Sequence, residues 1–208
     1  MLIIGAKGLA KEVLEIFHQQ NELKNIYFYD DVNADLPDKL YGQYPILKNT
    51  EQVSELFKKD NRFTIGIGNP VLRQKLYDKF IVLGGKFESS ISPLAQIGHF
   101  GNSIGDGCNI MTGTIITNDI TIGKGCLINL NSTIGHDCII GEFVELSPAV
   151  NISGNCSIGN YCTIGTGAIL LPKVKLGDGV TVGAGAVVTK DVEAGVTVVG
   201  MPSKPLLK

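Results

Sequence analysis

Residues 104–188 read IGDGCNIMTGTIITNDITIGKGCLINLNSTIGHDCIIGEFVELSPAVNISGNCSIGNYCTIGTGAILLPKVKLGDGVTVGAGAVV, and this stretch decides the fold. Every sixth residue is a branched aliphatic, over fifteen consecutive positions. A period of six fits neither a helix nor an ordinary alternating strand. It predicts hexapeptide repeats, in which each repeat is a short strand plus a corner and neighbouring coils bury each other's apolar edges. The aliphatic positions are Ile104, Ile110, Ile116, Ile122, Ile128, Ile134, Ile140, Leu146, Ile152, Ile158, Ile164, Leu170, Leu176, Val182 and Val188.

Three repeats should turn the chain through one triangle, so that residues eighteen apart stack at the sheet spacing of about 4.8 Å. The residue two before each aliphatic is small or β-branched and is expected to fill the interior. Glycine often follows the aliphatic, and we interpret these glycines as tight corners that need permissive dihedrals. They are Gly105, Gly123, Gly135, Gly141, Gly159, Gly165, Gly177 and Gly183.

All five cysteines occupy the inward repeat position. Cys108 is expected to stack under Cys126, and Cys138 under Cys156. Because free cysteine behaves as a small core hydrophobe, we interpret the five as reduced core filling. A metal site would need inward-facing histidine or carboxylate companions, and the repeat pattern supplies none. A disulfide framework would be unusual in a chain without an export signal.

Length and charge limit the classes of function. A chain of 208 residues can form one or two domains with real cores. The net charge of −2, without a basic stripe, argues against a nucleic-acid partner. The first four residues, MLII, are too short for a signal peptide, and no stretch approaches the ~20 apolar residues of a membrane helix. We therefore expect a cytoplasmic protein with no membrane partner.

The N-terminal residues follow a strand, glycine turn and helix pattern. Residues 2–4 predict a buried strand, Gly5-Ala6-Lys7-Gly8 a tight turn and residues 10–19 a helix. This order is typical of a nucleotide-binding α/β unit, where backbone N–H groups hold phosphate. The turn lacks the full G-x-G-x-x-G of dinucleotide enzymes, which argues against NAD. The alternative interpretation is a close strand–helix crossing without a ligand.

A second predicted strand, residues 26–29, ends in Asp30-Asp31, where such folds contact a ribose or base. The alternative is a solvated turn, since residues 32–45 look like a loop. Further elements are predicted in order: a helix at 51–59, a strand at 64–68 closed by Gly68-Asn69-Pro70, a helix at 71–83 and a strand at 86–92.

These patterns predict an α/β, Rossmann-like nucleotide-binding domain over residues 1–88 and a parallel β-helix over residues 89–208. The repeat is irregular at its start: Ile91 and Ile97 are six residues apart, but one extra residue separates Ile97 from Ile104. Such an irregularity is expected where the β-helix is capped. The tail from residue 196 is expected to leave the ladder and fold over the last coil, because an unpaired edge needs cover.

One of the three histidines is well placed for chemistry. His18 is expected on the surface at a helix end, and His99 in the ragged first coils. His136 stands at a corner two residues after an aliphatic position, so its ring should project outward beside Asp137. Stacking puts Asn118 one coil below and Gly154 one coil above, and Asn129 lies on the same coil. A neutral imidazole beside a carboxylate is a candidate general base.

Several motifs together resemble a known family. The run Asn129-x5-Ile134-Gly135-His136-Asp137-Cys138-Ile139-Ile140-Gly141-Glu142-Phe143 resembles the active-site segment of the bacterial sugar O-/N-acyltransferases. Gly5-x-x-Gly8-x-Ala10-Lys11-Glu12, Asp30-Asp31 and Ile67-Gly68-Asn69 also match, so the resemblance covers essentially the whole chain. The family includes sialic acid O-acetyltransferases (NeuD-like) and N-acetyltransferases of nucleotide-linked 4-amino-4,6-dideoxy sugars (PglD-like).

The resemblance implies left-handed winding, acetyl-CoA as co-substrate without a metal, and a homotrimer with active sites between subunits. It implies that His136 is the general base and that Asp137 raises its basicity. Coenzyme A would contact Glu145, Gly154, Gly165, Thr166 and Ala184. The nucleotide-linked sugar would contact Gly5, Ala6, Lys7, Gly8, Asp30, Asp31, Gly68, Asn69, Asn118 and Asn129. One departure is Leu9, which stands where the family commonly has histidine.

The expected reaction is direct acetyl transfer to a sugar amine, with no acyl-enzyme and with a glycine N–H such as that of Gly154 stabilising the oxyanion. The nucleotide-type domain favours N-acetylation of a nucleotide-linked amino sugar in bacterial glycan biosynthesis. The alternatives are O-acetylation of sialic acid or another glycan sugar, an acyl-carrier-protein-dependent acyltransferase, and a non-catalytic trimeric sugar-nucleotide scaffold. A γ-class carbonic anhydrase would need three histidines around zinc, and a nucleotidyltransferase would need a larger N-terminal domain.

Overall fold

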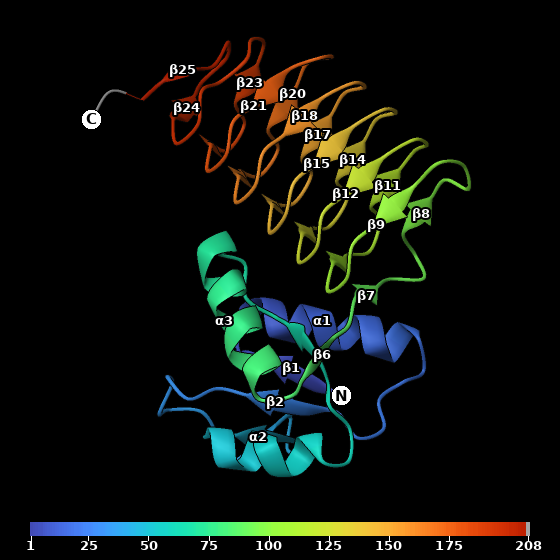
Figure 1. Cartoon of the computed structure of the whole chain (residues 1–208), viewed down its shortest axis with the longest axis vertical. Coiled ribbons are helices and arrows are strands. Elements are labelled where there is room, and N and C mark those ends of the chain that lie inside the picture. Colours follow the sequence, from blue (N-terminus) through green and yellow to red (C-terminus); the bar gives the residue numbers. More distant parts are fainter. Residues whose placement is uncertain (207–208) are drawn as a thin grey trace.

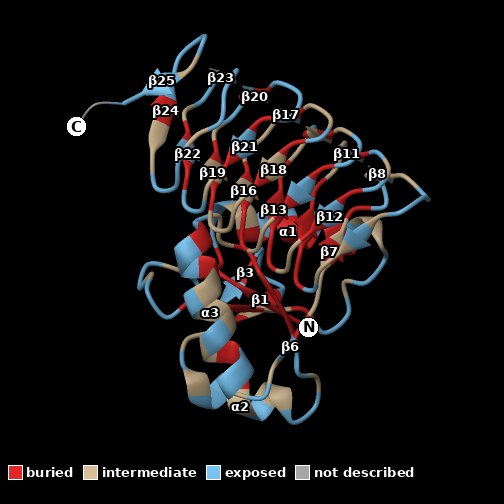
Figure 2. Cartoon of the chain, turned by 45° about the horizontal axis from the view of Figure 1, so that its top comes forward, coloured by how far each residue is buried: buried red, intermediate tan, exposed pale blue. Residues whose placement is uncertain are grey.

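The computed structural model describes residues 1–206 and shows an α/β half below a triangular β-helix (Figure 1). The α/β half has one six-stranded sheet in the order β3-β4-β2-β1-β5-β6, parallel except for the β3–β4 pair. The central strand β1 is fully buried between the helices (Figure 2). The elements are β1 Leu2–Ile4, α1 Gly8–Gln19, β2 Tyr27–Tyr29, β3 Lys39–Leu40, β4 Tyr44–Leu47, α2 Thr50–Phe57, β5 Arg62–Ile65, α3 Pro70–Val82 and β6 Lys86–Phe87.

The predicted order of elements in this half is confirmed, with boundaries shifted by a few residues at most places. Two predictions were wrong. The expected loop over residues 32–45 contains β3 and the start of β4, which pair antiparallel and extend the sheet. The single strand expected at 86–92 is two strands, β6 in the α/β sheet and β7 (Ser90–Ile91) in the β-helix, because the chain crosses between the two halves there.

The β-helix has the predicted register. Each of the fifteen aliphatic positions is the second residue of a two-residue strand, and strands eighteen residues apart pair in parallel, as in Asn109↔Leu127↔Glu145. The fold class, an α/β domain followed by a left-handed parallel β-helix, is confirmed. The strands are β8 Gln96–Ile97, β9 Ser103–Ile104, β10 Asn109–Ile110, β11 Ile115–Ile116, β12 Thr121–Ile122, β13 Leu127–Ile128, β14 Thr133–Ile134, β15 Ile139–Ile140, β16 Glu145–Leu146, β17 Asn151–Ile152, β18 Ser157–Ile158, β19 Thr163–Ile164, β20 Ile169–Leu170, β21 Lys175–Leu176, β22 Thr181–Val182 and β23 Val187–Val188.

These strands form three flat sheets, which we name by their members. Sheet I holds β7, β10, β13, β16, β19, β22, β24 and β25; sheet II holds β8, β11, β14, β17, β20 and β23; sheet III holds β9, β12, β15, β18 and β21. The interior is filled as predicted by the aliphatics and by the small residues two positions earlier. All five cysteines are free and buried, and each thiol donates to the carbonyl fifteen residues later, as Cys138 does to Ser153 O at 3.2 Å.

The predicted reason for the corner glycines was wrong. None of the eight glycines that follow an aliphatic has a positive φ; the left-handed residue lies two positions later, as at Asp137 (φ 58°) and Phe143 (φ 52°). The glycines instead permit close stacking: a Cβ built on Gly165 would lie 2.6 Å from the backbone nitrogen of Ala184 on the next coil. The repeat therefore selects glycine for space between coils, not for its dihedral freedom.

The C-terminal tail closes the open end of sheet I. Strand β24 (Thr197–Val199) pairs in parallel with β22, so the expectation that the tail leaves the ladder was wrong for these residues. The chain then reverses, and β25 (Lys204–Pro205) pairs antiparallel with β24 at the edge of the sheet. The final two positions of the predicted tail, 207–208, lie outside the described residues.

Arg73 on α3 joins the two halves. Its guanidinium is fully buried and donates to five acceptors: the carbonyl oxygens of Ile65 and Ile67 in the α/β half, those of Gly107 and Gly125 at β-helix corners, and Oδ1 of Asn109. Five is the full donor capacity of arginine. The residues after β5 are therefore held in a fixed position over sheet I.

Candidate active site

His136 lies at the corner between sheets II and III, and its side chain is 65% exposed. Its Nδ1 is 2.6 Å from Oδ2 of Asp137. The left-handed backbone of Asp137 turns the carboxylate back beside the ring. With Nδ1 donating to this carboxylate, Nε2 is the unprotonated nitrogen and can accept a proton. The predicted outward projection of the imidazole and its pairing with Asp137 are both seen.

The ring lies against Gly154 on the next coil, as the stacking predicted. A Cβ built on Gly154 would lie 2.7 Å from both Cε1 and Nε2 of His136. The N–H of Gly154 has no hydrogen-bond acceptor within residues 1–206. Asn118 lies one coil below, where its carbonyl accepts from the N–H of Asp137 at 3.3 Å and its Oδ1 accepts from Phe100 N at 3.2 Å.

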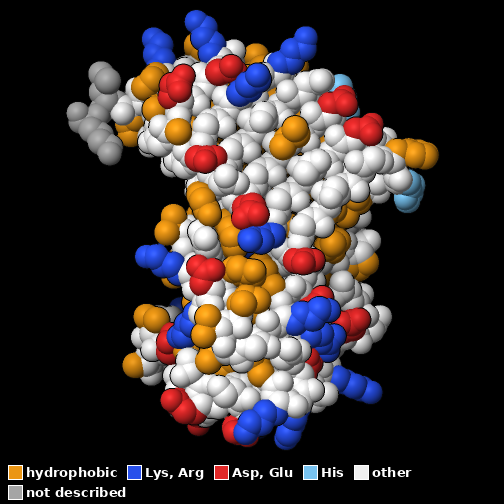
Figure 3. Space-filling model, viewed as in Figure 1, with side chains coloured by type: hydrophobic (Ala, Val, Ile, Leu, Met, Phe, Trp, Pro, Cys, Tyr) orange, Lys and Arg blue, Asp and Glu red, His pale blue; other side chains and the backbone are white. Residues whose placement is uncertain are grey.

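Other predicted residues lie away from this corner. Asn129 is buried at the corner between sheets I and II, with Oδ1 accepting from Leu130 N at 2.7 Å. His18 is exposed on α1, whereas His99 is exposed at the same corner as His136, two coils earlier. The visible histidines in Figure 3 lie at the rim of the β-helix that is remote from α3.

A cavity of about 220 Å³ opens at the carboxyl ends of β1, β2 and β5. This is the edge of a parallel α/β sheet where ligands bind. It brings together Gly5, Asp30 and Asp31 of the predicted sugar-nucleotide residues, and Ile67, which precedes Gly68, forms part of its wall. Its remaining lining is mostly apolar and includes Leu72 and Leu76 of α3.

The two aspartates of this cavity have different roles. Asp30 is buried and accepts from Asn33 N at 2.9 Å, so it fixes the loop after β2. Asp31 accepts from Tyr29 Oη at 2.7 Å and from Lys79 Nζ at 3.0 Å. Partial burial raises the pKa of Asp31, but the hydrogen bonds from Tyr29 and Lys79 outweigh it and hold this pKa below its usual value. Asp31 is therefore a charged acceptor at the rim of the cavity.

The predicted glycine turn is only partly at the cavity. Ala6 is buried, Lys7 pairs with Asp35 at 3.2 Å, and Gly8 begins α1. Leu9, where the family commonly has histidine, packs with Ile16, Met111 and Leu127 between α1 and the β-helix. Leucine at this position is thus explained by contact between the two halves.

After β5, Gly68 and Asn69 lead into α3. Oδ1 of Asn69 accepts from Leu72 N at 2.9 Å and caps the helix. Gly68 faces Glu145 of sheet I: a Cβ built on Gly68 would lie 3.0 Å from Oε1. Burial raises the pKa of Glu145, and the charge of Arg73 lowers it by less.

The residues predicted to contact coenzyme A are not gathered in one protomer. Gly165, Thr166 and Ala184 stack at the corner between sheets I and II. Gly154 lies with His136 at the next corner, and Glu145 lies under Gly68 on sheet I. Within one protomer, the His136 imidazole lies at the corner between sheets II and III, whereas the cavity belongs to the α/β half, which packs against sheet I. The two therefore face different sides of the β-helix.

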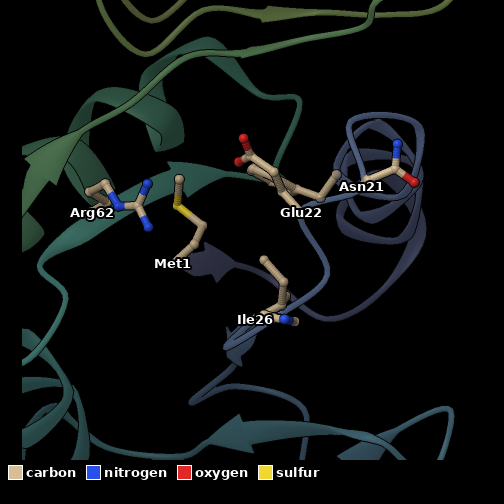
Figure 4. Close-up of a pocket in the computed structure, with 7 residues that line it drawn as sticks. Met1, Asn21, Glu22, Ile26 and Arg62 are labelled. Atoms are coloured by element: carbon tan, nitrogen blue, oxygen red, sulfur yellow. The ribbon is translucent and has the colours of Figure 1, made fainter.

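A second cavity, of about 310 Å³, lies at the opposite edge of the α/β sheet (Figure 4). Met1, Asn21, Glu22, Ile26 and Arg62 surround it at the amino ends of the strands. None of the predicted site residues lies there. Within residues 1–206, no three histidine, cysteine or acidic side chains are grouped to hold a metal ion, and no helix is both long and apolar enough to cross a membrane.

Sequence reasoning missed Arg73, Tyr29, Lys79 and the α3 leucines of the cavity. Tyr29 and Lys79 are fifty residues apart, and their 2.8 Å hydrogen bond depends on how α3 packs on the sheet. One sequence feature could have indicated Leu72 and Leu76 as cavity residues. They lie in the first turns of the helix that follows β5, at the edge of the sheet where ligands bind. No local pattern distinguishes Arg73 from a surface cation.

Comparisons with known proteins give consistent matches. Residues 1–80 match the PglD N-terminal domain, and residues 155–190 match the bacterial transferase hexapeptide (six repeats). No match is found among curated proteins.

Several solved structures resemble the whole chain, including the three that follow. A histidine variant of perosamine N-acetyltransferase from Caulobacter crescentus, in complex with CoA and GDP-perosamine, is 31% identical over 100% of this chain and 96% of that one, with a TM-score of 0.91. The acetyltransferase domain of PglB from Neisseria gonorrhoeae, in complex with acetyl coenzyme A, is 32% identical over 99% and 98%, with a TM-score of 0.90. WeeI from Acinetobacter baumannii is 35% identical over 99% and 98%, with a TM-score of 0.91.

Proposed function

The chain belongs to the PglD-like family of hexapeptide-repeat sugar acetyltransferases, and from this premise we propose that it transfers acetyl from acetyl-CoA to the amine of a nucleotide-linked amino sugar, with His136 as general base. Acetyl-CoA-dependent acetyltransferase activity follows from family membership. The choice of an amino sugar is supported by the N-acetyltransferase of C. crescentus, which was solved with CoA and GDP-perosamine. The observation that carries the general-base role is the exposed imidazole with Nδ1 2.6 Å from Asp137.

The proposed mechanism is direct attack. The sugar amine attacks the thioester carbonyl and gives a proton to Nε2 of His136, whose tautomer is fixed by Asp137. The N–H of Gly154, which has no acceptor within residues 1–206 and lies next to the ring, donates to the developing oxyanion. The imidazolium then returns the proton to the CoA thiolate as it leaves. No acyl-enzyme is needed, and the five cysteines are buried inside the coils.

Each active site is proposed to lie between two subunits of a homotrimer. Three groups that must meet during the reaction face different sides of one protomer: His136, the α/β cavity, and the Gly165–Ala184 corner. In the proposed trimer, the His136 corner of one subunit would face sheet I and the cavity of the next. Coenzyme A would lie along the corner of Gly165, Thr166 and Ala184 in the groove between subunits.

The activity is tested by thiol release from acetyl-CoA with UDP- and GDP-linked amino sugars and with free sialic acid as acceptors. The expected acceptor is an amino sugar nucleotide. His136→Ala should lower kcat by about 10²- to 10⁴-fold, the range of general-base catalysis. His18→Ala, an exposed histidine on α1, is the matched control and should leave kcat unchanged. Transfer only to sialic acid would indicate the O-acetyltransferase instead, and full activity of His136→Ala would exclude the imidazole as the base.

A further inference from the structure

Glu145 is a carboxylate at the boundary between the two halves. It is the outward residue of β16, and in the same column of sheet I Leu127 and Asn109 are buried beneath the α/β half. Glu145 and Thr163, which follows one coil later in the column, are both half-buried. The cover over this column is therefore already incomplete at Glu145.

Both carboxylate oxygens of Glu145 face the turn between β5 and α3. A Cβ built on Gly68 would lie 3.0 Å from Oε1 and 3.5 Å from Oε2. A side chain at residue 68 would contact this carboxylate, which glycine leaves accessible. Ile67, the preceding residue, lines the cavity at the carboxyl edge of the sheet. Gly68 and Glu145 do not line the cavity itself, so a ligand would have to extend past Ile67 to contact the carboxylate.

The Glu145 carboxylate has no hydrogen-bond or salt-bridge partner in the part of the chain that the structure describes. The nearest cation is Arg73, but all five of its donors are used by other acceptors. Partial burial raises the pKa of Glu145, as expected for a carboxylate that has lost part of its water and gained no donor within residues 1–206. Such a group is stabilised by a ligand that brings its own positive charge.

We infer that Glu145 binds the amino group of the sugar and so selects an amino sugar over its hydroxyl counterpart, an inference that rests on the proposed acetyl transfer. By resemblance Glu145 would contact coenzyme A, whereas its place against Gly68 aims it at the sugar. A sugar ammonium supplies a charge and N–H donors to a carboxylate that lacks both. A hydroxyl supplies only one neutral donor.

The sugar ammonium must lose two protons during the reaction, and His136 accepts only one of them. The Glu145 carboxylate can accept the other. A primary amine is largely protonated near neutral pH, and the ammonium has no lone pair with which to attack. The bound ammonium gives one proton to Glu145, leaving the neutral amine and a carboxylic acid. The nitrogen then forms its bond to the thioester carbon and gives its second proton to His136 of the adjacent subunit. The C–S bond breaks, the CoA thiolate takes that proton, and Glu145 returns its own proton to solvent.

The inference is tested by calorimetric binding of UDP- and GDP-linked 4-amino-4,6-dideoxyhexoses to the full-length protein. Each is compared with the counterpart that carries a hydroxyl at the same carbon. Wild type should prefer the amino form by roughly 10- to 100-fold, the value of a hydrogen bond to a charged group. Glu145→Gln should abolish this preference by weakening the amino form alone. Glu145→Asp, which keeps the charge, should retain part of it.

Glu142→Gln is the matched control, because Glu142 lies at the neighbouring corner and contacts Lys124 at 3.5 Å. It should bind like wild type. An unchanged preference in Glu145→Gln, in a protein that still transfers acetyl, would overturn the inference and leave the proposed function intact. Weaker acetyl-CoA binding in Glu145→Gln with an unchanged sugar preference would restore the coenzyme assignment. A wild-type protein that acetylates no amino sugar would instead refute the proposed function itself.

Discussion

The imidazole of His136 rests on Gly154, one coil later, with no space between them for a methyl group. A Cβ at residue 154 would lie 2.7 Å from Nε2, the nitrogen proposed to accept the proton. The backbone of Gly154 has no positive φ, so alanine is tolerated by the chain itself and affects only the ring.

Gly154→Ala is therefore expected to displace the imidazole and lower kcat/KM by about 100-fold, the effect of a misplacement of about 1 Å at a catalytic group. The melting temperature should change little, because the exposed ring can move toward solvent. Steady-state kinetics and thermal unfolding measure both effects. Ser153→Ala, the preceding corner residue, is the control. Wild-type kinetics in Gly154→Ala would show that the orientation of the ring seen here is not the reactive one.

Asp137→Asn should lower kcat by about 10- to 100-fold, because it removes a charge-assisted hydrogen bond that fixes the tautomer of His136. Asparagine adopts the left-handed conformation of residue 137 readily, so folding should be unaffected. Asp119→Asn is a closely matched control: Asp119 occupies the same corner position one coil earlier, also with φ 58°. An equal loss of activity in both variants would point to the corner backbone and not to the carboxylate.

The β-helix could be predicted from sequence because its pattern is local. A period of six fixes which side chains point inward, and stacking at eighteen residues predicts that His136 lies next to Gly154. The role of the corner glycines could not be read in this way. The left-handed dihedral falls on residues such as Asp137 and Phe143, and the close approach between coils is visible only in three dimensions.

The junction of the two halves could not be predicted, since it depends on contacts between distant segments. Arg73 looks like any helical cation in sequence, yet it is fully buried and bonds to Asn109, thirty-six residues away. Glu145 was singled out as a coenzyme A contact, which stays a prediction, and its contact with Gly68 depends on the placement of α3 against sheet I. The β3–β4 hairpin was missed because its strands are short and lie among loop-forming residues.

Arg73→Met should destabilise the protein by about 3 to 5 kcal/mol, because it leaves several buried oxygens without a donor. The loss should appear in urea unfolding monitored by circular dichroism. Lys75→Met, an exposed position on the same helix, should change the free energy of unfolding by less than about 0.5 kcal/mol. If Arg73→Met were as stable as Lys75→Met, the two halves would have to be held together by other contacts.

Glu145→Gln should stabilise the ligand-free protein near neutral pH. The pKa of Glu145 is raised in the folded state, by burial above all, so its ionisation costs folding stability. That cost begins as the pH rises above the unfolded value of about 4.3 and is complete above the folded pKa. We expect a higher Tm than that of wild type at pH 7 and an unchanged Tm below about pH 4. Glu142→Gln is the control; a lower Tm for Glu145→Gln at pH 7 would mean that the carboxylate has a stabilising partner.

Two inactive variants should restore each other's activity if the active site is shared between subunits. His136→Ala removes the proposed base, and Leu72→Trp fills the sugar-nucleotide cavity from a position that is 43% exposed, so the core is not disturbed. In a trimer reassembled from equal amounts, about a quarter of the sites would combine an intact imidazole with an intact cavity from the next subunit. Thiol release should therefore recover to about a quarter of the wild-type rate after co-refolding, and light scattering should give the mass of three chains. Sites contained within one subunit would give no recovery, because each chain in the mixture carries one of the two defects.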